Sequence, residues 1–136
     1  MRYLALAGDY DGTLATGGSM PPAGEEALGR LAATGRRARL VTGRQLDDLL
    51  SLLPRPERFD WIVAENGAVL YHPRSRQATD AAERVPAAFV DALRRRGVAP
   101  LSTGRVIVST WMPHETAGVE VMREMGLELQ VAFNKG

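Results

Sequence analysis

Asp9-Tyr10-Asp11-Gly12-Thr13-Leu14 directly follows a short apolar run, Tyr3-Leu4-Ala5-Leu6-Ala7, which predicts a buried strand over residues 3–8. Two carboxylates one residue apart therefore stand at the carboxyl end of a strand. In open α/β sheets this edge is where ligands bind. One carboxylate can attack a substrate while the other transfers protons, and together they can hold a divalent cation. An acidic turn with capping aspartates is the alternative, but this spacing after a strand favours a functional site.

Farther along the chain, apolar residues recur with the spacing of strands in some segments and of helices in others. Strands are predicted over residues 37–42, 60–64 and 68–72, and helices over 23–34 and 45–53. The order strand, helix, strand, helix, strand implies an α/β fold with a parallel sheet and right-handed crossovers.

The composition changes at residues 73–84, where charged and small residues predict a linker. Beyond it, helices are predicted over 86–96 and 114–125, and strands over 104–110 and 127–133. This second set of elements forms an α-β-α-β unit.

Bulk composition narrows the class of protein. The chain has 136 residues, 45% hydrophobic and 24% charged, which is typical of a globular protein with a real core. The net charge of +1 gives no case for nucleic acid as a partner. Without cysteine, disulfides, thiolate catalysis and cysteine-ligated zinc are excluded.

No apolar run approaches membrane-spanning length and no signal-peptide pattern opens the sequence, so we expect no membrane partner and a cytoplasmic location. Arginine replaces lysine almost throughout, which suggests a bacterial, GC-rich genome.

Three segments resemble motifs of the haloacid dehalogenase (HAD) superfamily. Asp9–Leu14 resembles motif I, Asp-x-Asp-Gly-Thr, of its phosphatases. Thr42-Gly43-Arg44, after the predicted strand 37–42, is similar to motif II. Val63-Ala64-Glu65-Asn66-Gly67-Ala68 is similar to a segment of the Cof-type subgroup, which includes sugar phosphatases. The resemblance implies a Rossmann-like HAD core over residues 1–78 and part of an inserted α+β cap domain over 79–136.

The resemblance also implies roles for these residues in a hydrolase that cleaves small phosphate monoesters. Asp9 would be the nucleophile that forms an aspartyl-phosphate, and Asp11 the general acid and base. Mg²⁺ would be held by the Asp9 carboxylate and the Asp11 backbone carbonyl. Phosphate would be bound by the Thr42 hydroxyl, the Gly43 N–H and the backbone that bends at Gly12.

Weaker expectations concern the substrate. Arg44 and Asn66 are candidate substrate contacts, with a solvated helix start and a tight Asn-Gly turn as their alternatives. Thr42 has an alternative role as the cap of helix 45–53. A phosphorylated small metabolite, such as a sugar phosphate, is the substrate class expected by analogy.

The chain also departs from the family pattern. HAD phosphatases need a lysine (motif III) and a later acidic pair (motif IV), yet no Asp or Glu follows Glu128 and the only lysine is Lys135. We therefore expect a chain that stops inside its cap and has little activity alone. Association with another copy, or with a polypeptide that carries the missing half, would be the route to activity. A phospho-accepting or phosphate-binding module without catalysis is the other alternative.

Overall fold

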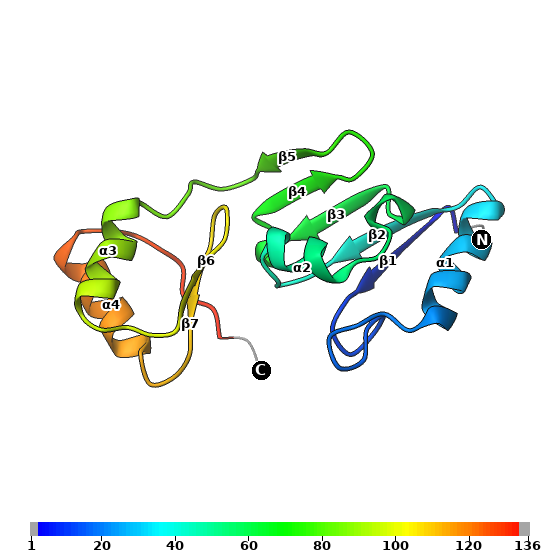
Figure 1. The fold of residues 1–136 in the computed structure, drawn as a ribbon. Helices are drawn as coiled ribbons and strands as arrows, with labels where there is room; N and C mark the ends of the chain where they lie inside the picture. The colour runs from blue at the N-terminus through cyan, green and yellow to red at the C-terminus, as the bar shows by residue number, and fades with distance from the viewer. Residues whose placement is uncertain (1–2, 134–136) are drawn as a thin grey trace. The chain divides into compact units, whose positions relative to one another are not determined.

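A computed structural model describes residues 3–133 and divides the chain into two compact units, the first ending at Ala82 and the second beginning at Glu83. The first unit contains five strands, two α-helices and two short 3₁₀ turns (Figure 1). Its elements are β1 (Ala5–Asp9), α1 (Pro22–Ala33), β2 (Arg37–Val41), α2 (Leu46–Leu52), η1 (Pro56–Arg58), β3 (Trp61–Ala64), η2 (Glu65–Gly67), β4 (Val69–His72) and β5 (Gln77–Asp80). The strands and helices predicted up to residue 72 are confirmed.

The five strands form one sheet in the order β1-β2-β3-β4-β5. Strands β1, β2 and β3 are parallel, and β4 and β5 are antiparallel to their neighbours. The α/β class is therefore confirmed, with a mixed sheet whose first three strands follow the Rossmann pattern. Asp9 pairs with Val41, and Val41 pairs with Val63, so the three parallel strands end together at one edge.

Within the first unit, helices cover one face of this sheet and leave the other uncovered. Because the order β1-β2-β3 proceeds in one direction, two right-handed crossovers place α1 and α2 on the same face. The buried side chains Leu40, Ile62 and Tyr71 lie in register on that face. On the opposite face, Val41 and Leu70 remain 42% and 36% exposed.

Strand β1 is an edge strand, because it pairs only with β2 within the described part of the chain. Apolar side chains in and before it are exposed: Tyr3 by 72%, Leu4 by 70% and Leu6 by 46%. The sequence predicted a buried strand here, since apolar runs normally lie inside parallel sheets. The prediction of burial is wrong for the described residues, which supply no neighbour on that side.

The segment expected to be a linker contributes a strand. Residues 73–76 form a turn after β4, and β5 then pairs antiparallel with β4. Its sequence, Gln-Ala-Thr-Asp, is short and polar, which is common for edge strands and hides them from hydrophobic patterns. The linker prediction was therefore wrong for residues 77–80.

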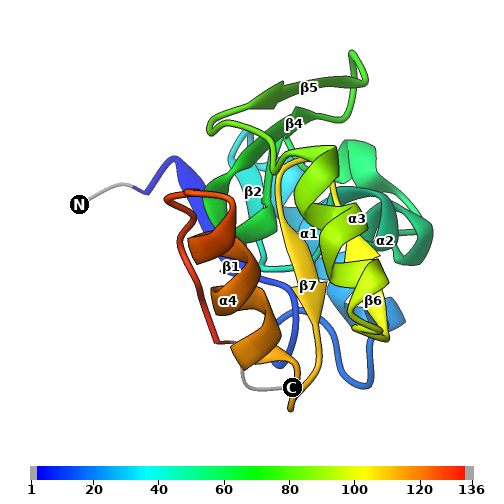
Figure 2. The ribbon, with the colours of Figure 1, turned by 90° about the vertical axis from the view of Figure 1, so that its left-hand side faces the viewer.

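The second unit contains α3 (Ala87–Arg95), β6 (Leu101–Thr103), β7 (Val108–Thr110) and α4 (Glu115–Glu124). Figure 2 shows α3 and α4 side by side. Their buried core consists of Phe89, Leu93, Val98 and Val121. None of the helices in the described residues combines the length and apolar character needed to cross a bilayer.

Two predictions in the second unit were wrong. Of the strand expected over 104–110, residues 108–110 form β7, whereas residues 104–107 form the turn that joins it to β6, closed by a hydrogen bond from the Gly104 N–H to the Ile107 carbonyl. Residues 127–133 form no strand, although apolar residues alternate there. Leu127 and Leu129 pack on the core of this unit, whereas Val131 and Phe133 are exposed. Alternation makes a strand only where a neighbour accepts its hydrogen bonds, and the hairpin does not pair with it.

Candidate active site at the carboxyl edge of the sheet

Asp9 ends β1, and its side chain is exposed at the carboxyl edge of the sheet. The chain then turns tightly, because the Tyr10 carbonyl accepts hydrogen bonds from the N–H groups of Leu14 (3.0 Å) and Ala15 (2.8 Å). Gly12 takes a positive φ of 74°, which a residue with a Cβ rarely adopts. Its N–H donates to the Ala15 carbonyl at 3.0 Å. Gly12 therefore shapes the turn, and its own N–H is taken by the Ala15 carbonyl. That the bend turns backbone N–H groups towards phosphate stays a prediction.

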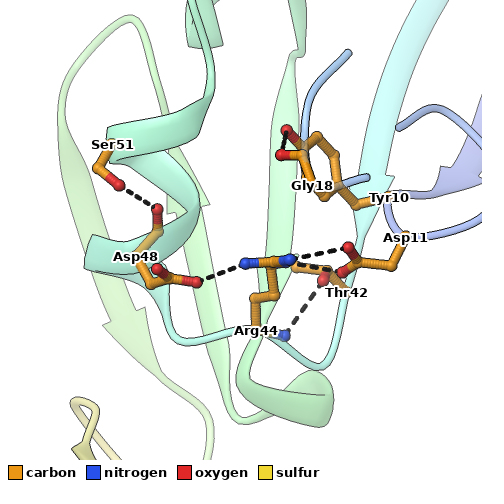
Figure 3. A network of polar contacts seen from close by, with 7 residues as sticks. All are labelled: Tyr10, Asp11, Gly18, Thr42, Arg44, Asp48 and Ser51. Atoms are coloured by element: carbon orange, nitrogen blue, oxygen red, sulfur yellow. Dashed lines mark hydrogen bonds and ion pairs between the residues drawn. The ribbon is translucent and has the colours of Figure 1, made fainter. Parts of the chain in front are cut away.

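Arg44 binds Asp11 through two parallel hydrogen bonds (Figure 3). Its Nε lies 2.7 Å from Asp11 Oδ2 and its Nη2 lies 2.9 Å from Asp11 Oδ1. The third nitrogen, Nη1, donates to Asp48 Oδ2 at 2.8 Å. This fork is the geometry in which arginine binds carboxylates and phosphates most strongly. Arg44 lies just before α2 with its side chain 29% exposed and all three guanidinium nitrogens bonded, so its role as a substrate contact stays a prediction.

Charge and burial shift two pKa values in this cluster. The hydrogen bonds to Asp11 raise the pKa of the Arg44 guanidinium, against a smaller opposing effect of burial. Burial raises the pKa of the Tyr10 phenol, while the nearby Arg44 charge lowers it. Arg44 lies 5.7 Å from the centre of the Tyr10 ring, and the Tyr10 hydroxyl donates to the Gly18 carbonyl at 3.2 Å. Tyr10 therefore packs near the Arg44 guanidinium, and its hydroxyl holds the loop that follows Asp11.

Thr42 lies one residue beyond β2 and is 3% exposed. Its N–H donates to the Val63 carbonyl at 2.9 Å, and its Oγ1 accepts the Arg44 N–H at 3.1 Å. The hydroxyl therefore shapes the loop before α2 and does not cap the helix itself, so the capping alternative is wrong. Gly43 lies between these two bonded residues in the same loop.

Sequence reasoning missed the structural role of Glu65. Glu65, Asn66 and Gly67 have φ values of 54°, 56° and 97°, so three successive residues are left-handed. The Glu65 N–H donates to the Arg44 carbonyl (2.9 Å) and the Asn66 N–H to the Thr42 carbonyl (3.3 Å). One feature of the sequence could have indicated this role. Gln45, the residue before α2, forms no side-chain cap, so the helix needs an acceptor from elsewhere in the chain.

The Glu65 carboxylate supplies the missing cap from a distance. Glu65 is 1% exposed, and its Oε1 accepts the Leu46 N–H at 3.4 Å. Asn66, by contrast, is exposed at the same edge. The structure thus brings Asp9, Asp11, Thr42, Arg44 and the backbone of Asn66 to one edge of the sheet.

The donors at this edge fit a divalent cation in type. Asp9 offers an exposed carboxylate, for which the described residues provide no ion pair. Asp11 offers a backbone carbonyl, while its carboxylate is held by Arg44. Within residues 3–133, no group of three or more His, Cys, Asp or Glu could hold a metal ion. Mg²⁺ commonly uses only one or two carboxylates together with substrate phosphate and water, so this donor set fits that ion.

Comparison with solved structures identifies the fold. A haloacid dehalogenase-like hydrolase from B. subtilis aligns with a TM-score of 0.56 and 24% identity, covering 86% of this chain and 42% of the other. The chain has a HAD-like fold. A HAD subclass IIB sugar phosphatase gives a TM-score of 0.52 at 23% identity, covering 92% of this chain and 50% of that chain. A haloacid dehalogenase-like hydrolase from Bacteroides thetaiotaomicron gives 0.57 at 18% identity, covering 96% and 56%.

These HAD-like structures share less than 25% identity with the chain, so the similarity establishes the fold and leaves the chemistry to be argued from the residues. The chain spans about half the length of the solved structures it matches. No family model matches the sequence, and no curated protein does. Lys135, the candidate for the HAD lysine, lies outside the described residues.

Proposed function

We propose that this HAD-like chain carries the nucleophilic half of a Mg²⁺-dependent phosphatase that hydrolyses small phosphate monoesters through an aspartyl-phosphate. The observation that carries the proposal is the placement of Asp9. Its carboxylate is exposed and unpaired at the carboxyl edge of the sheet, beside the loops that hold Asp11 and Thr42. A nucleophile must be free to reach phosphorus, and of the two aspartates only Asp9 is free.

In the first step, a carboxylate oxygen of Asp9 attacks the phosphorus atom and the bond to the ester oxygen breaks. The leaving oxygen takes a proton from Asp11, and the phosphoryl group stays on Asp9. In the second step, Asp11 removes a proton from water, which attacks the phosphorus and returns Asp9 and free phosphate. The Thr42 hydroxyl donates a hydrogen bond to a phosphoryl oxygen. Its Oγ1 already accepts a hydrogen bond from the Arg44 N–H, so the hydroxyl hydrogen is left for the phosphoryl group.

Arg44 controls which step Asp11 can perform. Both Asp11 carboxylate oxygens accept hydrogen bonds from Arg44, so neither presents a proton to a leaving group in this arrangement. The arrangement suits the base of the second step. For the first step, Arg44 must release Asp11, and the departing guanidinium is then available to the incoming phosphoryl group.

Asp9 and the Asp11 carbonyl would hold Mg²⁺, which when bound neutralises charge on the phosphoryl oxygens. A need for added positive charge follows from the carboxylates of Asp9, Asp11 and Asp48, which outnumber the single Arg44 guanidinium at this edge. A sugar phosphate is the substrate class we favour, on the likeness to a sugar phosphatase.

Low turnover is expected for the 136-residue chain alone. Arg44 is already shared by two carboxylates, and the described residues place no second cation in this cluster. The exposed edge of β1 offers a place where a second copy or a complementing polypeptide could add to the sheet.

The test combines phosphate release from an aryl phosphate with intact-mass measurement in the presence of Mg²⁺. We expect turnover below about 1 per second and the gain of one phosphoryl group on the wild-type chain, both lost in Asp9→Asn. Asp47→Asn, an exposed carboxylate on α2, is the matched control and should behave as wild type. Labelling that persists in Asp9→Asn would overturn the assignment of the nucleophile.

A further inference from the structure

A second charged site lies at the opposite edge of the sheet, where the parallel strands begin. A cavity of about 260 Å³ is formed there by the C-terminal half of α1, the start of β2, the residue before β3 and the turn after β4. Asp9 and Thr42 lie at the other ends of the parallel strands, so this cavity is separate from the candidate active site.

The cavity has a large excess of positive charge. Its lining contains four arginines, Arg36, Arg37, Arg58 and Arg74, against a single carboxylate, Asp60. The Arg36 Nε donates to the Tyr3 carbonyl at 3.0 Å. Across residues 3–133, the other three arginines have no carboxylate within ion-pair distance. The C-terminal end of α1 offsets only about half of one elementary charge.

Arg58 packs against α1 between this cavity and a larger one, whose lining includes Gly29. A Cβ atom added at Gly29 of α1 would lie 3.3 Å from Arg58 Nη1, so the guanidinium lies directly against the helix backbone. Arg58 also borders a neighbouring cavity of about 620 Å³. The arginines there are matched by acids, with Arg55 3.5 Å from Glu25 and Arg30 3.9 Å from Glu26. Arg36, Arg37 and Arg74 line the smaller cavity and not the larger one, so most of the unbalanced charge lies at the smaller cavity.

We propose that this cavity binds a small polyanion that carries phosphoryl groups, of the size of a diphosphate. Guanidinium groups bind phosphate oxygens in pairs through charge-assisted hydrogen bonds. The volume of about 260 Å³ is below that of sites for drug-sized ligands, which favours a compact ion. The arginines come from three different segments, with Arg37 at the start of β2, Arg58 in η1 and Arg74 in the turn after β4.

The experiment is calorimetric titration of the full chain with inorganic pyrophosphate, with EDTA present to exclude any Mg²⁺-dependent binding at Asp9. We expect saturable binding at one site, weakened about tenfold or more in Arg58→Gln and in Arg74→Gln, as for loss of a charge-assisted hydrogen bond. Arg95→Gln, an exposed arginine on α3, is the charge-matched control and should bind as wild type. Asp9→Asn should also bind as wild type, which separates this site from the proposed phosphatase.

A second pair of variants tests the position of Arg58 without changing any charge. Gly29→Ala should change the affinity for pyrophosphate, because the new methyl group lies 3.3 Å from Arg58 Nη1 and the guanidinium must shift. Gly118→Ala adds the same methyl group in α4, where nothing lies within 4 Å, and should leave binding unchanged. Equal affinity in Arg58→Gln, Arg95→Gln and wild type at matched ionic strength would overturn the proposal, as would binding that Asp9→Asn abolishes.

Discussion

The Arg44 guanidinium donates hydrogen bonds to both carboxylate oxygens of Asp11, from Nε at 2.7 Å and from Nη2 at 2.9 Å. Its third nitrogen, Nη1, donates to Asp48 Oδ2 at 2.8 Å. The two contacts differ in kind, because the first is a two-bond fork between loops and the second a single bond within a helix start. A double-mutant cycle should therefore find a coupling free energy of about 1 kcal/mol for Arg44 and Asp11 and about 0.4 kcal/mol for Arg44 and Asp48. Urea unfolding of Arg44→Gln, Asp11→Asn, Asp48→Asn and the double variants measures both. Equal couplings would mean that the fork does not persist in solution.

Tyr10 should destabilise the fold at high pH. Burial raises the pKa of its phenol above the ordinary value of about 10, so the unfolded chain releases this proton first as the pH rises. The free energy of unfolding should therefore be constant with respect to this group below pH ~10 and should fall above it. Tyr10→Phe should remove that part of the pH dependence, which urea unfolding at a series of pH values measures. Tyr3→Phe, with its side chain exposed, is the control.

Glu65 should stabilise α2 through the cap that it gives to Leu46. Glu65→Ala removes the acceptor and should lower the free energy of unfolding by about 1–2 kcal/mol. Glu65→Gln keeps a carbonyl oxygen in place and should cost much less. Glu57→Ala, at an exposed acidic position in η1, should cost less than about 0.5 kcal/mol. A Gln variant as unstable as the Ala variant would show that the carboxylate charge, and not the cap, matters.

The two helix glycines should respond differently to alanine. Gly118→Ala in α4 meets open space and should raise the free energy of unfolding by up to about 1 kcal/mol, because alanine favours the helix. Gly29→Ala in α1 gains the same propensity but pushes on Arg58, so its gain should be smaller or absent. Thermal unfolding of both variants provides the comparison. A larger gain in Gly29→Ala would contradict the close contact between Arg58 and the helix.

The free edge of β1 should make the chain associate as its concentration rises. Leu4 is 70% exposed there, and exposed apolar edge strands without charges pair readily. Leu4→Glu should shift sedimentation towards the monomer, because a charge at an edge opposes pairing. Thr79→Glu on β5, the other edge strand, is the control and should leave association unchanged. A wild-type chain that stays monomeric at all concentrations would refute this prediction.

Much of the first unit was predictable because its signals are local. Apolar runs ended by Gly, Pro or acidic residues predicted β1–β4 and both helices, and parallel topology then placed Asp9 and Thr42 at one edge. Strand β5 was missed because its polar sequence owes its conformation to pairing with β4. The strand expected over 127–133 failed for the converse reason, because its alternation found no partner.

At the candidate site, residue types were predictable but contacts were not. The motifs drew attention to Asp9, Asp11 and Thr42, and the sequence left Arg44 undecided between substrate and solvent. Only the structure places its guanidinium between Asp11 and Asp48, because that depends on the register of β1 and β2. Glu65 was hidden for the same reason, since its carboxylate caps a helix that begins nineteen residues earlier.

The left-handed reversal at Glu65 and Asn66 fastens two loops into one piece. Its N–H groups are bonded to the carbonyls of Arg44 and Thr42, so the backbone after β2 cannot swing away without breaking the turn after β3. Arg44 would then release Asp11 by rotation of its side chain, while its main chain stays in place. Opening this side-chain gate would break the hydrogen bonds of all three guanidinium nitrogens while leaving the backbone contacts intact.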